Sequence, residues 1–224
     1  MPKTIPEIRQ LVAGHVQDAA EKLSGTDLVA AIEEAIGGRY SKDRPRALVA
    51  DLVGDGAQFE WDVSALGGWQ AGFSHVASIE YPQGERVPCY LDNADWQLYE
   101  SPAAQFLRFA FTPASGKTAR VTFTMPHSPD ASTVPDADFY ALGALAASLA
   151  ARRLAALYAQ TGDSSIAADT VNYRTKSQEY LALARRLEKD YENLLGTDPE
   201  RTAPASSRTA AWEGSTAGGD RLTH

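Results

Sequence analysis

Cysteine is almost absent from this sequence. The chain of 224 residues contains one, Cys89, which excludes an intrachain disulfide and any metal site built from several cysteines. The four histidines, His15, His75, His127 and His224, show no spacing such as His-Glu-x-x-His that binds zinc. The sequence therefore predicts neither a disulfide framework nor a metal centre.

Excess positive charge and long hydrophobic runs are lacking as well. With 21 Lys and Arg against 29 Asp and Glu, the formal net charge is −8, so the chain lacks the basic field with which many nucleic-acid-binding proteins attract phosphate. The first residues, MPKTIPEIRQLV, lack the apolar core of a secretion signal, and the most apolar stretch, Ala141 to Ala159, is interrupted by Arg152 and Arg153. We expect a packed helix there, synthesis in the cytoplasm and no membrane contact.

Two short segments resemble ligand-binding loops, and each lacks an essential part. Asp51, Asp55 and Asp62 fall at positions 1, 5 and 12 of a calcium loop, but Val53 at position 3 cannot bind calcium and a strand pattern begins inside the loop. In Ser115-Gly-Lys-Thr118 the end of a phosphate-binding loop is followed by a strand pattern, not by the helix whose amides would bind phosphate. We predict a glycine turn from Asp51 to Gly56 and a hairpin turn at the second segment.

Catalytic patterns are also incomplete. Gly72-Phe-Ser74-His75 lacks the second glycine of a nucleophile elbow. Asp136 and Asp138 could be paired carboxylates, but they stand in the first turn of a predicted helix, where the helix dipole favours anions. No set of nucleophile, base and metal ligands emerges, so we predict that the chain is not an enzyme and binds no cofactor.

Aromatic residues recur in the middle of the chain. On alternating strands they are typical of the core of a small sheet, and they are also the side chains with which a carbohydrate-binding module contacts sugar rings. Both interpretations stay open for Trp61, Trp69, Tyr81, Tyr90, Trp96 and Tyr99.

Helical spacing of apolar residues marks the first part of the chain. Apolar residues recur every three or four positions from Ile8 to Leu23, and again from Leu28 to Ile36. Thr26 is the expected N-cap of the second helix, and Gly37-Gly38 is its expected end. The two segments predict a helical hairpin.

From about Ala57 the apolar period changes to two residues, which predicts strands. Turn residues such as Gly, Pro and Asn separate the apolar segments. We expect an antiparallel module of five or six strands, the first near Phe59 to Val63 and the others near 73–81, 88–92, 95–100, 105–111 and 119–125.

Helical patterns return in the last third. One helix is predicted from Asp136 to about Gln160, and another from Thr170 to Leu195 before Gly196. The second helix should bury one apolar stripe against a partner helix, made of Tyr173, Tyr180, Ala184, Leu187, Tyr191 and Leu194. The last 28 residues are rich in Pro, Gly, Ser and Thr, a composition that does not form a core of its own.

These patterns together predict an α+β fold. A helical core, formed by an N-terminal helical hairpin and two long C-terminal helices, contains an inserted antiparallel β module and continues into an extended C-terminal tail. The expected division is 1–50 for the N-terminal part of the core, 51–130 for the β module, 131–196 for the C-terminal part of the core and 197–224 for an interaction tail.

Three stretches carry a resemblance to a known family. They read AIEEAIGGRYSKDRPRALVADLVGDGAQFEW, GWQAGFSHVASIEYPQGERVPCYLDNADWQLYE and SSIAADTVNYRTKSQEYLALARRLEKDYENLLG. Over about Leu28 to Gly196 the chain resembles the head-tail connector proteins of tailed bacteriophages, also called adaptor or neck proteins. The resemblance lies in the overall pattern and not in a catalytic signature. Another tail-completion or baseplate protein of the virion remains an alternative.

The resemblance implies a structural role in the virion, at the junction of head and tail. In that family about a dozen copies form a ring, here expected to be a dodecamer, below the portal protein and above a downstream neck or tail protein. Genomic DNA passes through the lumen without sequence-specific binding. An acidic chain suits a channel wall along which DNA must slide, and a ring gives long amphipathic helices more surface to bury.

The resemblance also implies where subunits and partners meet. Pro45 should break the helix at the exit from the helical core, and Arg44 and Arg46 should pair with acidic groups of the same or an adjacent subunit. The tail should order on docking into a neighbour, with Trp212 as its anchor. The expected interface residues are Arg44, Arg46, Arg152, Arg153, Tyr173, Arg174, Lys176 and Trp212.

Overall fold

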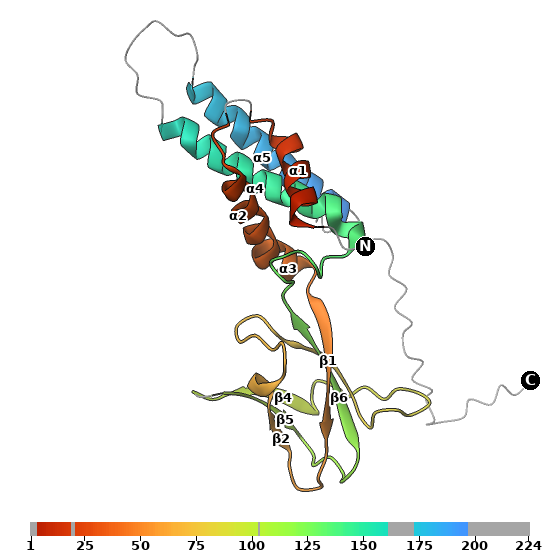
Figure 1. The fold of residues 1–224 in the computed structure, drawn as a ribbon. Coiled ribbons are helices and arrows are strands. Elements are labelled where there is room, and N and C mark those ends of the chain that lie inside the picture. The colour runs from red at the N-terminus through yellow and green to blue at the C-terminus, as the bar shows by residue number, and fades with distance from the viewer. Residues whose placement is uncertain (1–3, 19–20, 103, 161–172, 197–224) are drawn as a thin grey trace, which may run out of the picture.

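A helical bundle and a β module lie end to end in the computed structural model (Figure 1). The structure describes residues 4–18, 21–102, 104–160 and 173–196. Each part has its own hydrophobic core. The α+β class predicted from the sequence is confirmed, with helices beside two small antiparallel sheets.

Helix α4, Phe139–Gln160, lies at the centre of the bundle. It packs against α5, Tyr173–Leu195, along one side and against α1, Ile5–Val16, and α2, Gly25–Ala35, elsewhere (Figure 1). Because neighbours surround its first half, small residues fill it, and nearly every position from Ala141 to Ala151 is buried.

By length and composition, one helical stretch in the described part of the chain, Asp136–Gln160, could cross a membrane. However, 67% of its most apolar window is buried inside the protein. The central helix of a soluble bundle passes the same test, since it is apolar on all sides. The packed helix predicted at Ala141 to Ala159 is the helix found.

Helix α1 is shorter than the sequence predicts. It ends at Val16 instead of continuing to Leu23, because Gln17 adopts a left-handed conformation with φ of +48°. The Gln17 amide still donates to the Ala13 carbonyl at 3.0 Å. The Asp18 carboxylate then accepts the Leu23 amide at 2.8 Å and turns the chain towards α2.

The boundaries of α2 also differ from the prediction. Its N-cap is Ser24 and not Thr26, since the Asp27 carboxylate accepts the Ser24 amide at 2.8 Å in a capping box. The helix does not stop at Gly37-Gly38. It continues as a π turn, η1 at Ile36–Tyr40, in which Gly38 has φ −90° and ψ −105°, and ends with the single turn α3, Ser41–Asp43.

The β module contains six strands among the described residues, in two three-stranded antiparallel sheets with orders β1-β6-β3 and β2-β5-β4. Their facing sides share one apolar core that includes Leu52, Ile79, Leu107 and Val121. The strands are β1 Arg46–Val53, β2 Glu60–Asp62, β3 Val76–Glu80, β4 Trp96–Glu100, β5 Gln105–Phe109 and β6 Thr118–Met125.

Strand β1 was not predicted. Asp51 was interpreted as the start of a turn, but it lies inside β1 opposite Arg120 of β6, and their side chains form an ion pair at 2.9 Å. The turn begins only at Gly54. Strand structure therefore starts at Arg46, ahead of residue 51 where the sequence placed the β module, and the domain division itself stays a prediction.

Two further expectations for the module were wrong. The segment 88–92 is not a strand and makes only an isolated bridge between Tyr90 and Glu80. The turn at Ser115-Gly-Lys-Thr118 exists, with Gly116 at φ +76°, but it does not close a hairpin because β5 and β6 belong to different sheets. The other predicted strands are present, four of them with shorter bounds and β6 with one more residue at its start.

The long C-terminal helices match their predictions closely. The chain turns through a single 3-10 turn, Asp136–Asp138, into α4, and α5 ends before Gly196, whose φ is +71°. The buried stripe of α5 contains Ala184, Leu187 and Tyr191 as expected, but Leu195 closes it and Leu194 is exposed. Buried positions three or four residues apart follow the 3.6-residue turn of the helix more closely than a strict seven-residue repeat does.

Candidate functional site

The bundle and the module are connected at one place, which we call the joint and define as residues 39–46 and 126–138. The chain leaves the bundle through α3 into β1 and returns from β6 towards α4 (Figure 1). The segment that combines basic residues with Pro45 lies in this joint. Its side chains make two sets of contacts, one with α5 of the bundle and one with the segment that returns from β6 to α4.

The π turn sends two consecutive side chains in different directions. Arg39 reaches α5 and Tyr40 reaches the segment that leads into α4. A π turn inserts an extra residue into a helix and changes the direction of the side chains that follow. The turn thus positions both contacts of the joint.

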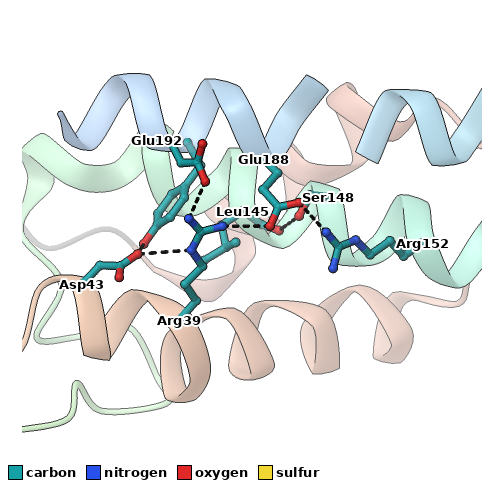
Figure 2. Close-up of polar contacts among 8 residues, drawn as sticks. Arg39, Asp43, Leu145, Ser148, Arg152, Glu188 and Glu192 are labelled. Carbon is teal, nitrogen blue, oxygen red and sulfur yellow. Dashed lines mark hydrogen bonds and ion pairs between the residues drawn. The ribbon is translucent and has the colours of Figure 1, made fainter. Parts of the chain in front are cut away.

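Arg39 binds three carboxylates. Its guanidinium lies 2.8 Å from Glu188, 2.5 Å from Glu192 and 3.3 Å from Asp43 (Figure 2). Hydrogen bonding to Glu192 is the main cause that raises the pKa of Arg39 above its usual value. Glu188 also accepts a hydrogen bond from Arg152 of α4, so one network joins η1, α4 and α5.

Two buried phenols complete the contacts. The Tyr40 hydroxyl donates to Asp138 Oδ2 at 2.8 Å, and the Tyr191 hydroxyl donates to Asp43 Oδ2 at 2.7 Å. Both tyrosines are fully buried, and burial raises the pKa of each phenol far above its ordinary value. A raised pKa keeps both hydroxyls protonated at neutral pH, where they act as donors.

His127, on the segment that returns from β6, forms hydrogen bonds with Ser41 and Arg44 of the segment that leaves the bundle. Its Nε2 lies 2.8 Å from the Arg44 carbonyl and its Nδ1 lies 3.1 Å from Thr133 Oγ1, while its amide donates to Ser41 Oγ at 2.9 Å. Since a carbonyl only accepts, Nε2 carries the hydrogen, and in the neutral ring Nδ1 accepts from Thr133. The ring also packs 5.0 Å from that of Tyr40.

The two arginines predicted at the exit do not find acidic partners in the described part of this chain. Arg44 Nη2 donates to the Leu195 carbonyl at 3.3 Å, where a cation suits the C-terminal end of α5. Arg46 is the half-buried first residue of β1. Their pairing with an adjacent subunit stays a prediction.

The other predicted interface residues are scattered. Arg152 pairs with Glu188, and Arg153 pairs with Glu34 at 2.6 Å and donates to the Asp27 carbonyl at 2.8 Å. The ammonium of Lys176 lies 5.5 Å from the ring centre of Tyr158. The side chains of Tyr173 and Arg174, like all of Trp212, lie outside the described residues. The interface set as a whole stays a prediction.

Sequence reasoning missed Arg39, Asp43, Asp138, Glu188 and Glu192 as members of one site. Glu188 and Glu192 are four residues apart on α5, a spacing that places both on one face. That spacing was the available signal. Arg39 is adjacent to Tyr40, but the π turn that aims it at α5 has no sequence signature beyond Gly37-Gly38.

The strand aromatics mostly belong to the core. Trp61, Trp69, Tyr81 and Trp96 pack against the buried cluster of the module. Tyr90 and Tyr99 are exposed. One face of the Tyr99 ring is covered by Arg108, whose guanidinium carbon lies 3.6 Å from the ring centre. Within the described ranges, no group of three or more His, Cys, Asp or Glu is placed to hold a metal ion.

Comparisons with known proteins found no matching family model and no matching curated protein. Three similar solved structures come from gene transfer agent (GTA) particles, described as the neck of an empty particle with C6 symmetry, the virion of a native particle and the neck of a native particle with C12 symmetry. Identity is 15%, 14% and 15%, over 79%, 79% and 80% of this chain and 87%, 87% and 94% of theirs. The TM-scores are 0.28, 0.29 and 0.26, which are too low to argue a shared fold or function.

Proposed function

We propose that this chain is a structural virion protein of a tailed phage or phage-like particle, which joins head to tail. In this role copies of the chain form a ring around the DNA channel, with the portal protein on one side and a downstream neck or tail protein on the other. The proposal draws on the sequence resemblance over Leu28 to Gly196. The GTA particle structures reported above do not support the proposal, because their TM-scores are below 0.5.

The observation that carries the proposal is the joint. Between two parts with separate cores, His127 holds the outgoing and returning segments together, and Tyr40 and Arg39 bind the outgoing segment to the bundle. Buried hydrogen bonds of this kind resist bending because each broken one leaves a polar group without a partner. A protein that transmits position between two partners needs such a rigid connection, whereas many enzymes need a cleft that opens.

The charges are also suited to a channel wall. Arginines that could grip phosphate are paired with carboxylates of the same chain, which reduces their attraction for DNA. This holds for Arg39, Arg108, Arg120, Arg152 and Arg153. With a net charge of −8, the surface should let DNA slide.

Gold labelling of particles tests the proposal. Antibodies against residues 57–126 should label the head-tail junction of purified particles in negative-stain electron microscopy. Label at the distal tail would instead indicate a tail-completion or baseplate protein. Absence of the chain from particles, checked by denaturing immunoblot so that a hidden epitope is not missed, would overturn the virion assignment and favour glycan-binding assays with Tyr90→Ala and Tyr99→Ala variants.

A further inference from the structure

Strand β1 has an edge on which no strand lies among the described residues. It pairs with β6 on its other side, and the order of its sheet is β1-β6-β3. The Gly54 amide donates to the Lys117 carbonyl at 2.8 Å, in the same register as the β1–β6 pair. Backbone groups alternate along a strand, so Leu52 and Leu48 face β6, whereas Val53 and Val49 face away from it.

The same edge is apolar and unprotected. Val49 and Val53 are 56% and 62% exposed. Between Ala47 and Val53 the only charged residue is Asp51, and Arg120 neutralises it at 2.9 Å. The register with β6 contains no bulge, and the strand contains no proline or lysine. Proteins that remain single protect such edges with charges, prolines or bulges.

Strand β4 presents a matching edge in the other sheet. It pairs only with β5, and the Ala110 amide donates to the Asp95 carbonyl at 2.7 Å in the register of that pair. Trp96, Leu98 and Glu100 therefore direct their backbone groups away from β5. Apart from Asp51 and Glu100, the free-edge positions of both strands carry apolar side chains. Val49 and Val53 of β1 and Leu98 of β4 are exposed, whereas Trp96 packs partly against the module core.

We infer that β1 of one copy pairs with β4 of the next copy, so that the β modules join into a continuous sheet. Pairing would satisfy the free backbone groups of both edges, and the valines of β1 would cover Leu98 of the neighbour. Because the two edges differ, the contact is head-to-tail, and a head-to-tail contact builds a ring where the rotation between copies closes. The inference rests on the proposed function, in which copies form a ring.

Cysteine cross-linking tests this contact. In a Cys89→Ser background, purified protein that carries Val49→Cys together with Leu98→Cys is oxidised at high concentration. Val53→Cys with Leu98→Cys is tested as a second pair, because possible strand registers differ in steps of two residues. We expect a ladder of covalent dimers, trimers and larger species. Val49→Cys alone and Leu98→Cys alone should remain monomeric on a denaturing gel.

A charge placed on the edge gives an independent readout. Val49→Lys should weaken self-association at least about tenfold in sedimentation experiments, since the lysine would be buried against the neighbour. Val87→Lys is the matched control, because Val87 is also exposed but lies outside the strands. Its self-association should be unchanged, and circular dichroism should show that both variants remain folded.

Several outcomes would overturn the inference. A covalent dimer from Val49→Cys alone would mean that β1 pairs with β1, and no cross-link in any pair would mean that the edges do not meet. If labelling places the chain at the head-tail junction and no β1–β4 cross-link forms, only this inference fails. If the cross-link forms but the chain is absent from particles, the proposed function fails and the edge contact stands.

Discussion

The hydroxyl of Tyr40 donates to Asp138 at 2.8 Å across 98 residues of sequence. Tyr40 is fully buried, whereas Asp138 is half-buried. The Tyr40→Phe change should lower the free energy of unfolding by about 1–2 kcal/mol, because a buried hydrogen bond to a carboxylate is lost without a change in packing volume. Urea unfolding followed by circular dichroism measures this loss.

Tyr140→Phe is the control for this substitution. Tyr140 is 64% exposed, so removal of its hydroxyl should change stability by less than about 0.5 kcal/mol. Equal losses in the two variants would show that the Tyr40 hydroxyl has no special role in the joint.

The Arg39 network makes a second prediction. Arg39→Ala leaves Asp43, Glu188 and Glu192 close together without their shared cation. The side chain of Arg39 is 37% exposed, so solvent screens each pair, and the summed loss should be about 1–2 kcal/mol. Arg39→Lys should recover part of it, since one ammonium cannot replace the planar fork.

Salt separates the network from simple packing. The difference in free energy of unfolding between the wild type and Arg39→Ala should become smaller when ionic strength rises to about 1 M, where charges are screened within about 3 Å. Arg86→Ala, at an exposed arginine in a loop, should cost little at either salt concentration. A loss for Arg39→Ala that does not change with salt would argue that packing of the side chain carries the effect, since its guanidinium carbon lies 5.1 Å from the ring centre of Tyr191.

The sequence predicted elements with strong periodicity and failed where tertiary contacts decide. Helices α4 and α5 follow from their apolar spacing. Strand β1 was missed because most of its residues are Ala, Val and Leu without polar alternation, and because Asp51 in a run with Gly54 suggested a turn. Only the opposing Arg120, 69 residues away, gives Asp51 its place in a strand.

The joint was outside the reach of sequence patterns for the same reason. A periodic pattern reports which face of an element is buried, and it contains no information on which distant side chain lies opposite. The basic stretch around Arg44 and Arg46 drew attention to the right segment, yet Arg39 makes the ion pairs there. The π turn directs the side chain of Arg39 towards α5. The geometry of this turn depends on the packing of α2 against α4.

The cap of α2 predicts a dependence on pH. Hydrogen bonds from the side chain and then the backbone of Ser24 hold the pKa of Asp27 below its ordinary value of 3.8. A lowered pKa in the folded state means that the stabilising effect is present above the ordinary value and is lost as pH falls through the folded-state pKa. Asp27→Asn should therefore reduce the change in melting temperature between neutral pH and acid.

Glu33→Gln provides the comparison on the same helix. Glu33 is exposed, and in the described part of the chain its side chain makes no hydrogen bond or ion pair, although its carbonyl accepts the Ile36 amide. Thermal unfolding followed by circular dichroism at a series of pH values below 5 should give the wild-type profile for this variant. A profile for Asp27→Asn with the same acid slope as the wild type would remove the capping explanation.

The connection through His127 makes the last prediction. His127→Phe keeps the ring against Tyr40 but leaves the Arg44 carbonyl and the Thr133 hydroxyl without that partner, which should cost about 1–3 kcal/mol. Hydrogen exchange should quicken at amides of residues 126–134, while amides in the core of β6 exchange as before. His15→Phe, at an exposed position on α1, should leave both quantities unchanged. Faster exchange throughout the module would mean that His127 supports the whole sandwich and not the two connecting segments alone.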